Sequence, residues 1–137
     1  MIHSLIATYR IIRRVIKKAP RRPASTRTRT EYLRFKESAR VLIHHRLEYF
    51  NAHYKLTNGR VSIKNQRTKW GSCSSKGNLN FSYRIMKLPP ELQDYLIVHE
   101  LCHLAELNHG PKFWALVAET IPDYKKAHTL LRTGVFK

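Results

Sequence analysis

Two histidines four residues apart, His99 and His103, constrain what this chain can fold into more than any other feature. On an α-helix, residues with this spacing lie about 40° apart around the axis and about 6 Å apart along it, so both imidazoles can reach one point in space. The apolar run Tyr95-Leu96-Ile97-Val98 just before them indicates that this helix is buried. Buried histidines need polar partners, and a metal ion shared by both is one that suits this spacing.

Glu100, between the two histidines, is the carboxylate that metal-assisted hydrolysis requires. Zinc binds imidazole nitrogen at roughly 2.0–2.1 Å, and catalytic zinc sites combine three protein ligands with a water molecule. A carboxylate next to the ligands can take a proton from that water and deliver it to a leaving amine. The pattern therefore predicts a zinc-dependent metallopeptidase site with Glu100 as general base.

His109 is the first choice for a third ligand. On an unbroken helix it would lie about 15 Å beyond His99, too far away to share an ion, so the helix must end first. Asn108 and Gly110 tolerate left-handed backbone, and Pro111 disfavours simple continuation of the helix. The sequence therefore predicts that the chain folds His109 back toward the histidine pair.

Other interpretations of the motif remain open. Glu106 on the motif helix and Glu119 on the next helix are weaker candidates for the third ligand. The histidine spacing equals that of the metzincins, but Glu106 occupies that pattern's glycine position and no methionine follows, so we do not assign the chain to that class. The plainest alternative is a surface helix that happens to carry two histidines, in a chain with eight.

The chain is strongly basic. Its formal net charge of +17 comes from 26 basic and 9 acidic residues, and such a field attracts polyanions. Residues 10–36 hold eleven of the basic residues and a single acid, Glu31. We expect this segment to bind nucleic acid or another anionic surface, unless it is only a solvated tail.

Composition predicts two parts, a basic segment and linker at residues 1–30 and one catalytic domain at residues 31–137. Apolar residues recur near helical spacing over residues 2–16, but arginines interrupt them, so they do not resemble a secretory signal. Residues 17–30 mix proline, serine and threonine with basic residues, which is typical of an extended linker. No stretch is apolar enough to span a membrane, and a soluble cytoplasmic protein is the expectation.

The two cysteines, Cys73 and Cys102, form neither a close metal-binding pair nor a disulfide framework. Cys102 would lie about 60° from His99 on the motif helix and could line the site, but a small buried thiol is the simpler interpretation.

Hydrophobic periodicity predicts a helix followed by a pair of strands. Thr28 and Glu31 have the spacing of a capping box and begin a long amphipathic helix, which Asn58-Gly59 ends. Alternating residues over 61–70 and 79–85 flank a polar turn at 71–77, so we expect an antiparallel hairpin.

Three more helices follow the strands. Prolines mark their starts, with Pro90 opening the motif helix, Pro111 the next and Pro122 preceding a terminal helix that ends near Gly134. This order predicts an α+β domain with a small antiparallel sheet packed against helices.

Several short motifs in a fixed order carry more information than the histidines alone. They are Arg67-Thr68-Lys69-Trp70-Gly71-Ser72-Cys73-Ser74, Leu88-Pro89-Pro90-Glu91-Leu92, Asp94-Tyr95, His99-Glu100-Leu101-Cys102-His103, Asn108-His109, Phe113-Trp114 and Pro122-Asp123-Tyr124-Lys125. Together they resemble the YgjP-like metallopeptidase family, allied to the SprT-like zinc peptidases. The resemblance covers about residues 31–137.

This resemblance implies a zincin-like domain in which His99, His103 and His109 bind zinc and Glu100 is the general base. Longer family members carry an N-terminal β-rich portion, and we expect the short basic segment of residues 1–30 to stand in place of most of it.

Spacing does not identify the group that would stabilise negative charge on the substrate's carbonyl oxygen. Arg67, Tyr95, Tyr124 and His128 are candidates by residue type. An edge strand within residues 79–85 would hold an extended polypeptide by strand addition.

Two other classes of function compete with a simple peptidase. A nucleic-acid-binding module with a structural zinc would need a fourth protein ligand, such as Cys102. A peptidase recruited to DNA-bound proteins, as in SprT-like relatives, would account for the charge. A third alternative is a latent peptidase whose basic N-terminus folds over its own cleft. Iron, nickel or cobalt can also occupy such a nitrogen-rich site.

Overall fold

The structure of the protein, a computed structural model, describes residues 24–133, with side chains from residue 29 onward. Its elements in chain order are α2 (Ala24–Tyr54), β1 (Val61–Lys64), β2 (Gly71–Cys73), β3 (Leu79–Ser82), the 3-10 helix η1 (Tyr83–Lys87), α3 (Pro90–Cys102), α4 (Pro111–Thr120) and α5 (Tyr124–Arg132). Helices and a small sheet in one unit confirm the α+β class. The expected helix at residues 2–16 lies outside the described residues.

The sheet is mixed, with strand order β1-β3-β2. β1 runs parallel to β3, with Val61 opposite Leu79, whereas β2 pairs antiparallel with the other side of β3. The predicted hairpin between 61–70 and 79–85 is therefore wrong. Part of the expected polar turn at 71–77 is instead strand β2, which has no apolar alternation because only its backbone is needed to pair with β3.

β3 is also shorter than its alternation suggested. Apolar side chains continue at Tyr83 and Ile85, both buried, but the backbone changes to the 3-10 helix η1 after Ser82. The Ser82 hydroxyl accepts a hydrogen bond from the Arg84 amide at 3.3 Å and so caps this helix. Alternation alone does not distinguish this short helix from more strand.

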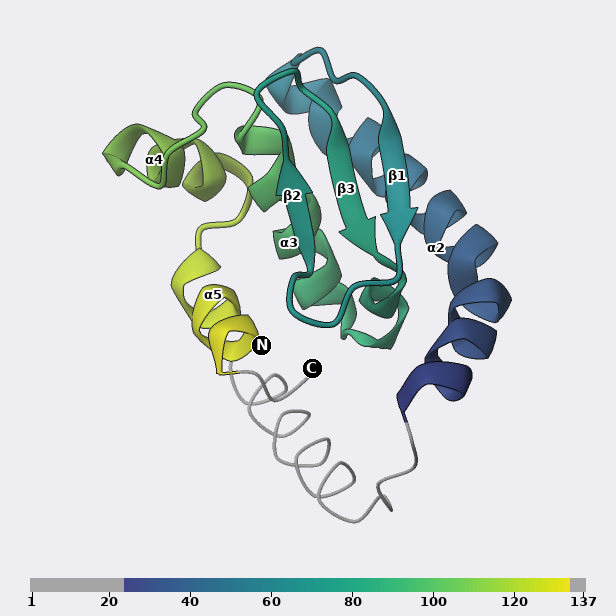
Figure 1. Ribbon diagram of the computed structural model, residues 1–137. Coiled ribbons are helices and arrows are strands. Elements are labelled where there is room, and N and C mark those ends of the chain that lie inside the picture. Colours follow the sequence, from purple (N-terminus) through teal and green to yellow (C-terminus); the bar gives the residue numbers. More distant parts are fainter. Residues whose placement is uncertain (1–23, 134–137) are drawn as a thin grey trace.

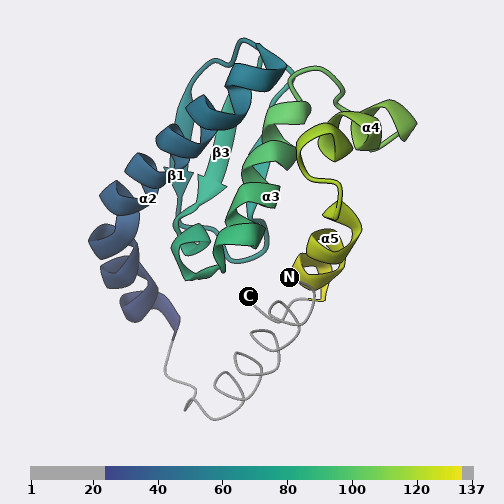
Figure 2. The same ribbon diagram turned by 180° about the vertical axis from the view of Figure 1, so that it is seen from behind.

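The helices α2 and α3 lie side by side across one face of the sheet, and α4 and α5 flank α3 on the side of β2 (Figures 1 and 2). Helix α3 is buried on nearly all sides, since it contacts α2, α4, α5 and β2. The core is continuous across both layers and includes Ile43, Leu79, Phe81, Leu92, Ile97, Val98, Leu101, Phe113 and Val117.

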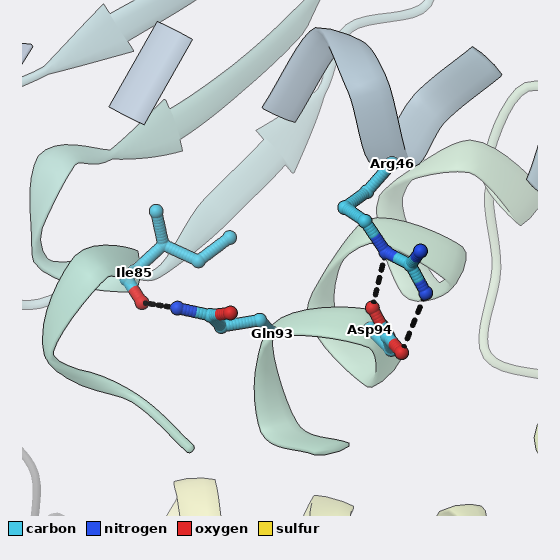
Figure 3. Close-up of polar contacts among 4 residues, drawn as sticks. All are labelled: Arg46, Ile85, Gln93 and Asp94. Atoms are coloured by element: carbon cyan, nitrogen blue, oxygen red, sulfur yellow. Dashed lines mark hydrogen bonds and ion pairs between the residues drawn. The ribbon is translucent and has the colours of Figure 1, made fainter. Parts of the chain in front are cut away.

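Polar contacts fix the orientation of α3 (Figure 3). The Arg46 guanidinium of α2 donates two hydrogen bonds to the Asp94 carboxylate, each 2.8 Å long. The Gln93 side-chain amide donates to the carbonyl oxygen of Ile85 at 2.9 Å. Bidentate pairing of this kind restricts rotation of α3 about its axis, and therefore the direction in which His99 faces.

Helix α2 begins earlier than expected, at Ala24. Thr28 therefore lies inside the helix and is not its cap, and the last seven residues of the expected linker, 24–30, are helical. Extending an existing helix carries no nucleation penalty, so a long helix can recruit residues of modest helical propensity.

Helix α2 also ends earlier than Asn58-Gly59. It stops at Tyr54, and Lys55 takes a left-handed φ of 54°. The Asn51 side chain then bonds both the amide and the carbonyl of Leu56, at 2.8 and 2.7 Å, and closes the helix end. Hydrogen bonds from the Asn51 side chain to the backbone of Leu56 thus end the helix in place of the predicted glycine turn.

The starts of α3 and α4 at Pro90 and Pro111 agree with the prediction, as does a separate helix α5 after Pro122. In the part of the chain described, none of the helices has the length and apolar character needed to cross a bilayer.

Candidate metal centre and cleft

The imidazoles of His99, His103 and His109 point their Nε2 atoms at one another. The Nε2 atoms of His99 and His103 lie 3.2 Å apart, and each lies 3.1 Å from the Nε2 of His109. Two nitrogens bound to one tetrahedral zinc ion at roughly 2.0–2.1 Å are separated by about 3.3–3.4 Å. The triangle therefore matches the size of a zinc site, and within residues 24–133 these three form the group able to hold a metal.

The Nδ1 atoms of His103 and His99 each have a hydrogen-bond partner, and the partner of His103 fixes its tautomer. His103 Nδ1 lies 2.9 Å from the carbonyl oxygen of Glu106, which can only accept, so Nδ1 carries the proton. His99 Nδ1 lies 3.1 Å from the hydroxyl of Tyr95. Bonds of this kind hold a ligand ring in place and leave the Nε2 lone pair for a metal. The donor set thus fits zinc in chemistry as well as in size.

Burial favours the neutral imidazole at His99 and His103. Burial, with smaller effects of His103 and His109, lowers the pKa of His99 to about 3. Burial also lowers the pKa of His103. His109 is exposed, so the centre is closed on the α3 side and open to solvent on the other. A neutral imidazole is the form that binds metal.

Local structure explains how the third histidine returns. Helix α3 ends at Cys102, and a turn carries the chain to Gly110, which precedes α4. The Phe113 ring of α4 stacks on His103 with centroids 4.3 Å apart, and Trp114 stacks on His109 at 5.8 Å. Two consecutive aromatic residues thus support two of the three imidazoles.

The alternative ligands lie elsewhere. Glu106 offers its carbonyl oxygen to His103, and its carboxylate is not part of the triangle. The Glu119 carboxylate lies 3.8 Å from the His53 imidazole of α2. Cys102 is fully buried and is not part of the triangle either. The structure therefore brings His109, and none of these three, to the histidine pair.

Glu100 is 4% exposed, and its burial raises the pKa of its carboxyl group to about 8, although Lys69 acts in the opposite direction. Its side chain lies against Gly71 of β2. A Cβ atom at Gly71 would come within 3.0 Å of both Cγ and Oε1 of Glu100, and within 2.9 Å of the Asn80 carbonyl oxygen. Only glycine leaves room for this carboxylate.

Sequence reasoning had no means of finding the contact between Gly71 and Glu100. The two residues are distant in the chain, and glycine at this position is needed for space and not for a left-handed backbone, since Gly77 is the glycine with positive φ among the described residues. The motif Trp70-Gly71-Ser72 gave a signal that some constraint existed, but not which one.

A cleft of about 230 Å³ opens beside the triangle. Three segments form its walls, and their lining residues are Lys69, Trp70 and Gly71, then Tyr95, Leu96, His99 and Glu100 from α3, and His128, Leu131 and Arg132 from α5. His99 of the triangle and Glu100 therefore line the same cleft.

The four residues expected near the substrate separate into two groups. Tyr95 and His128 line the cleft, and the Tyr95 hydroxyl lies 3.0 Å from His128 Nδ1. Arg67 and Tyr124 are not among its lining residues, and the Tyr124 ring stacks on Trp114 with centroids 4.9 Å apart.

The expectation that residues 79–85 form an edge strand is wrong. β3 is the central strand, and the edges of the sheet are β1 and β2. β2 is the edge on the side of α5 and the cleft (Figure 1).

The chain matches the family model described as YgjP-like, metallopeptidase domain, over residues 4–134. No curated protein gives a significant match.

Two solved structures share the fold. The metallopeptidase zymogen abylysin of Pyrococcus abyssi has a TM-score of 0.59 and 22% identity, over 66% of this chain and 92% of that one. The metallopeptidase zymogen jannalysin of Methanocaldococcus jannaschii has a TM-score of 0.53 and 21% identity, over 69% of this chain and 94% of that one.

Proposed function

Because the chain belongs to the YgjP-like metallopeptidase family, we propose that it hydrolyses peptide bonds with a zinc ion held by His99, His103 and His109. The observation that carries the proposal is the triangle of Nε2 atoms 3.1–3.2 Å apart. Zinc, when bound, acidifies a water molecule and polarises the substrate's carbonyl group.

Glu100 is the general base in this proposal. Its carboxyl group shares the cleft with His99, and a zinc ion beside it would lower the pKa that burial raises, which favours the ionised form. The carboxylate then takes the proton of the attacking water and delivers it to the leaving nitrogen. Gly71 supports this role, because it lets the carboxylate lie against β2, where an added Cβ would displace it. The low exposure of Glu100 also limits competition from bulk water.

The substrate is an extended polypeptide that pairs with the free edge of β2. Within residues 24–133, β2 pairs with β3 on one side and has no strand on the other, so that side offers backbone donors and acceptors. Gly71, the first residue of β2, and Lys69 and Trp70 just before it line the cleft together with Glu100. A polypeptide on this edge would pass in front of the general base.

A structural zinc is less well supported than a catalytic one. Structural sites usually have four protein ligands, whereas the described residues supply three here, and His109 is exposed. An open position is what a reacting water needs.

Binding of nucleic acid through residues 10–36 stays a prediction, as do the division of the chain at residue 30 and the cytoplasmic location. Binding that depends on phosphate contacts would weaken steeply with salt and on removal of residues 10–29.

The decisive experiment compares Glu100→Gln with Glu106→Gln, a matched change near the same centre. The purified proteins are analysed for zinc and then assayed with quenched fluorescent casein. We expect about one zinc per chain in both and a loss of roughly 10²–10⁴-fold in kcat for Glu100→Gln alone. Full activity of zinc-loaded Glu100→Gln would contradict the assignment.

Two additions make the experiment interpretable. His109→Ala should lose zinc while Glu119→Gln keeps it, which tests the third ligand. Because abylysin and jannalysin were solved as zymogens, we infer that this chain can also be latent. Activity is therefore measured before and after limited proteolysis, and a rise after cleavage would indicate latency.

A further inference from the structure

Helix α5 contributes a histidine that the proposed reaction has not used. His128 lines the cleft together with His99 and Glu100, and α5 lies beside α3 (Figure 2). Its Nδ1 lies 3.0 Å from the Tyr95 hydroxyl, which also lies 3.1 Å from His99 Nδ1. The phenol oxygen thus joins two imidazoles.

The direction of these two hydrogen bonds follows from the donors available. With a metal ion bound by the three Nε2 atoms, as proposed, the proton of the neutral His99 ring would lie on Nδ1 and be donated to the Tyr95 oxygen. The single phenol proton is then free for His128 Nδ1, which accepts it. A neutral imidazole that accepts at Nδ1 carries its own proton on Nε2.

His128 therefore presents an Nε2–H donor. Among the residues that the structure describes, this nitrogen has no hydrogen-bond partner, although the side chain lines the cleft. The edge-to-face contact with Trp114, at 5.1 Å between centroids, holds the ring in place. Burial lowers the pKa of His128, with smaller contributions from Arg132 and His109, which favours the neutral ring.

The other candidates for this role are less suitable. Arg67 and Tyr124 do not line the cleft. Tyr95 is 2% exposed, and its hydroxyl already contacts the imidazoles of His99 and His128. Lys69 and Arg132 also line the cleft, whereas the His128 ring is in addition held by Tyr95 and Trp114.

We propose that His128 is a catalytic residue whose Nε2–H donates a hydrogen bond to the scissile carbonyl oxygen as that oxygen gains negative charge, with its tautomer set by the chain His99–Tyr95–His128. Donors that are fixed before the reaction are effective because they need no reorganisation. The inference rests on the proposed peptidase function and assigns it a residue beyond the ligands and the base.

The test compares His128→Ala, His128→Gln and Tyr95→Phe in the full chain, with His45→Ala as a control because His45 is an exposed residue of α2. For His128→Ala we expect kcat to fall about 10²–10³-fold, with little change in KM and with zinc affinity retained. Glutamine can place an N–H where Nε2 stood, so His128→Gln should recover part of the loss. His45→Ala should behave as wild type.

Tyr95→Phe separates positioning from direct contact. It removes the bond to His99, so zinc affinity measured by chelator competition should fall about 10–100-fold. Nitrogen-15 NMR of the imidazoles supplies a readout independent of activity, and it should show His128 protonated at Nε2 in the wild type and a mixture of tautomers in Tyr95→Phe.

Three results would overturn the inference. They are unchanged kcat in His128→Ala, equal losses of kcat and zinc affinity in that variant, or a wild-type His128 protonated at Nδ1. Failure of the proposed function is distinguishable, because it would appear as full activity in Glu100→Gln whatever His128 does.

Discussion

Replacing Gly71 by alanine should damage the site without touching a proposed metal ligand. The added methyl group would lie 2.9 Å from the carbonyl oxygen of Asn80 and 3.0 Å from two atoms of Glu100. The Glu100 side chain can rotate away, but the Asn80 carbonyl belongs to the backbone of β3. Relief of the clash therefore requires β2 to shift, the carboxylate to move, or both.

The size of the effect follows from these contacts. One extra methyl group in a close-packed region costs about 1–3 kcal/mol in unfolding free energy. For a domain of this size, each kcal/mol lowers Tm by about 4–8 °C. Misplacement of a catalytic group by about 1 Å reduces turnover by roughly 10²-fold. Gly71→Ala should therefore lose both stability and kcat while still binding about one zinc.

Gly110→Ala is the matched control. No heavy atom lies within 4 Å of a Cβ at Gly110, and its φ of −84° suits alanine. Its position as the N-cap of α4 makes a loss of at most about 1 kcal/mol the expected cost. Thermal unfolding, zinc content and casein hydrolysis are measured for both variants. Gly71→Ala with wild-type kcat and Tm would refute the steric account, and lost stability with intact kcat would limit Gly71 to a packing role.

Three further predictions concern the scaffold and the metal. Asp94→Asn removes the bidentate partner of Arg46. Because both side chains are about a quarter exposed, we expect the free energy of unfolding, measured by chemical denaturation, to fall by about 1–2 kcal/mol. A change of less than a few tenths of a kcal/mol would refute this. Tyr54→Phe removes the hydroxyl contacts to the Leu116 carbonyl at 2.6 Å and to Thr120 Oγ1 at 2.8 Å, and should lower the free energy of unfolding by about 1–2 kcal/mol in the same assay. An unchanged value would mean that apolar contacts alone hold α4. Chelation of the metal should abolish hydrolysis, and added zinc should restore it. Chelation should also lower Tm, because the ion binds the folded state. Activity that survives chelation would contradict a catalytic metal.

The helical parts of the fold were predictable because their signals are local. Proline at a first helical turn and periodic apolar residues depend on neighbours within a few positions, and α3 and α4 begin at Pro90 and Pro111 as expected. The ends of α2 were predicted less well. They depend on helix propagation past Thr28 and on the Asn51 side chain, which compete with the capping and turn signals in the sequence.

The sheet was not predictable in the same way. Its mixed pairing depends on which strand lies beside β3 in space, and β2 has no alternating pattern of its own. The same distinction applies to the site. The convergence of His99 and His103 follows from helix geometry, whereas the contacts of Glu100 with Gly71 and of Tyr95 with His128 join residues far apart in the chain.

All three imidazoles of the triangle come from residues 99–109, one helix end and the turn after it. An ion held there closes a loop of only about ten residues, so it removes little entropy from the unfolded chain and does not tie distant elements together. The cleft is assembled differently, since its walls come from residues 69–71, α3 and α5. The three histidines of the triangle and most of the cleft walls therefore come from different stretches of chain, and α3 is the element that both of them share.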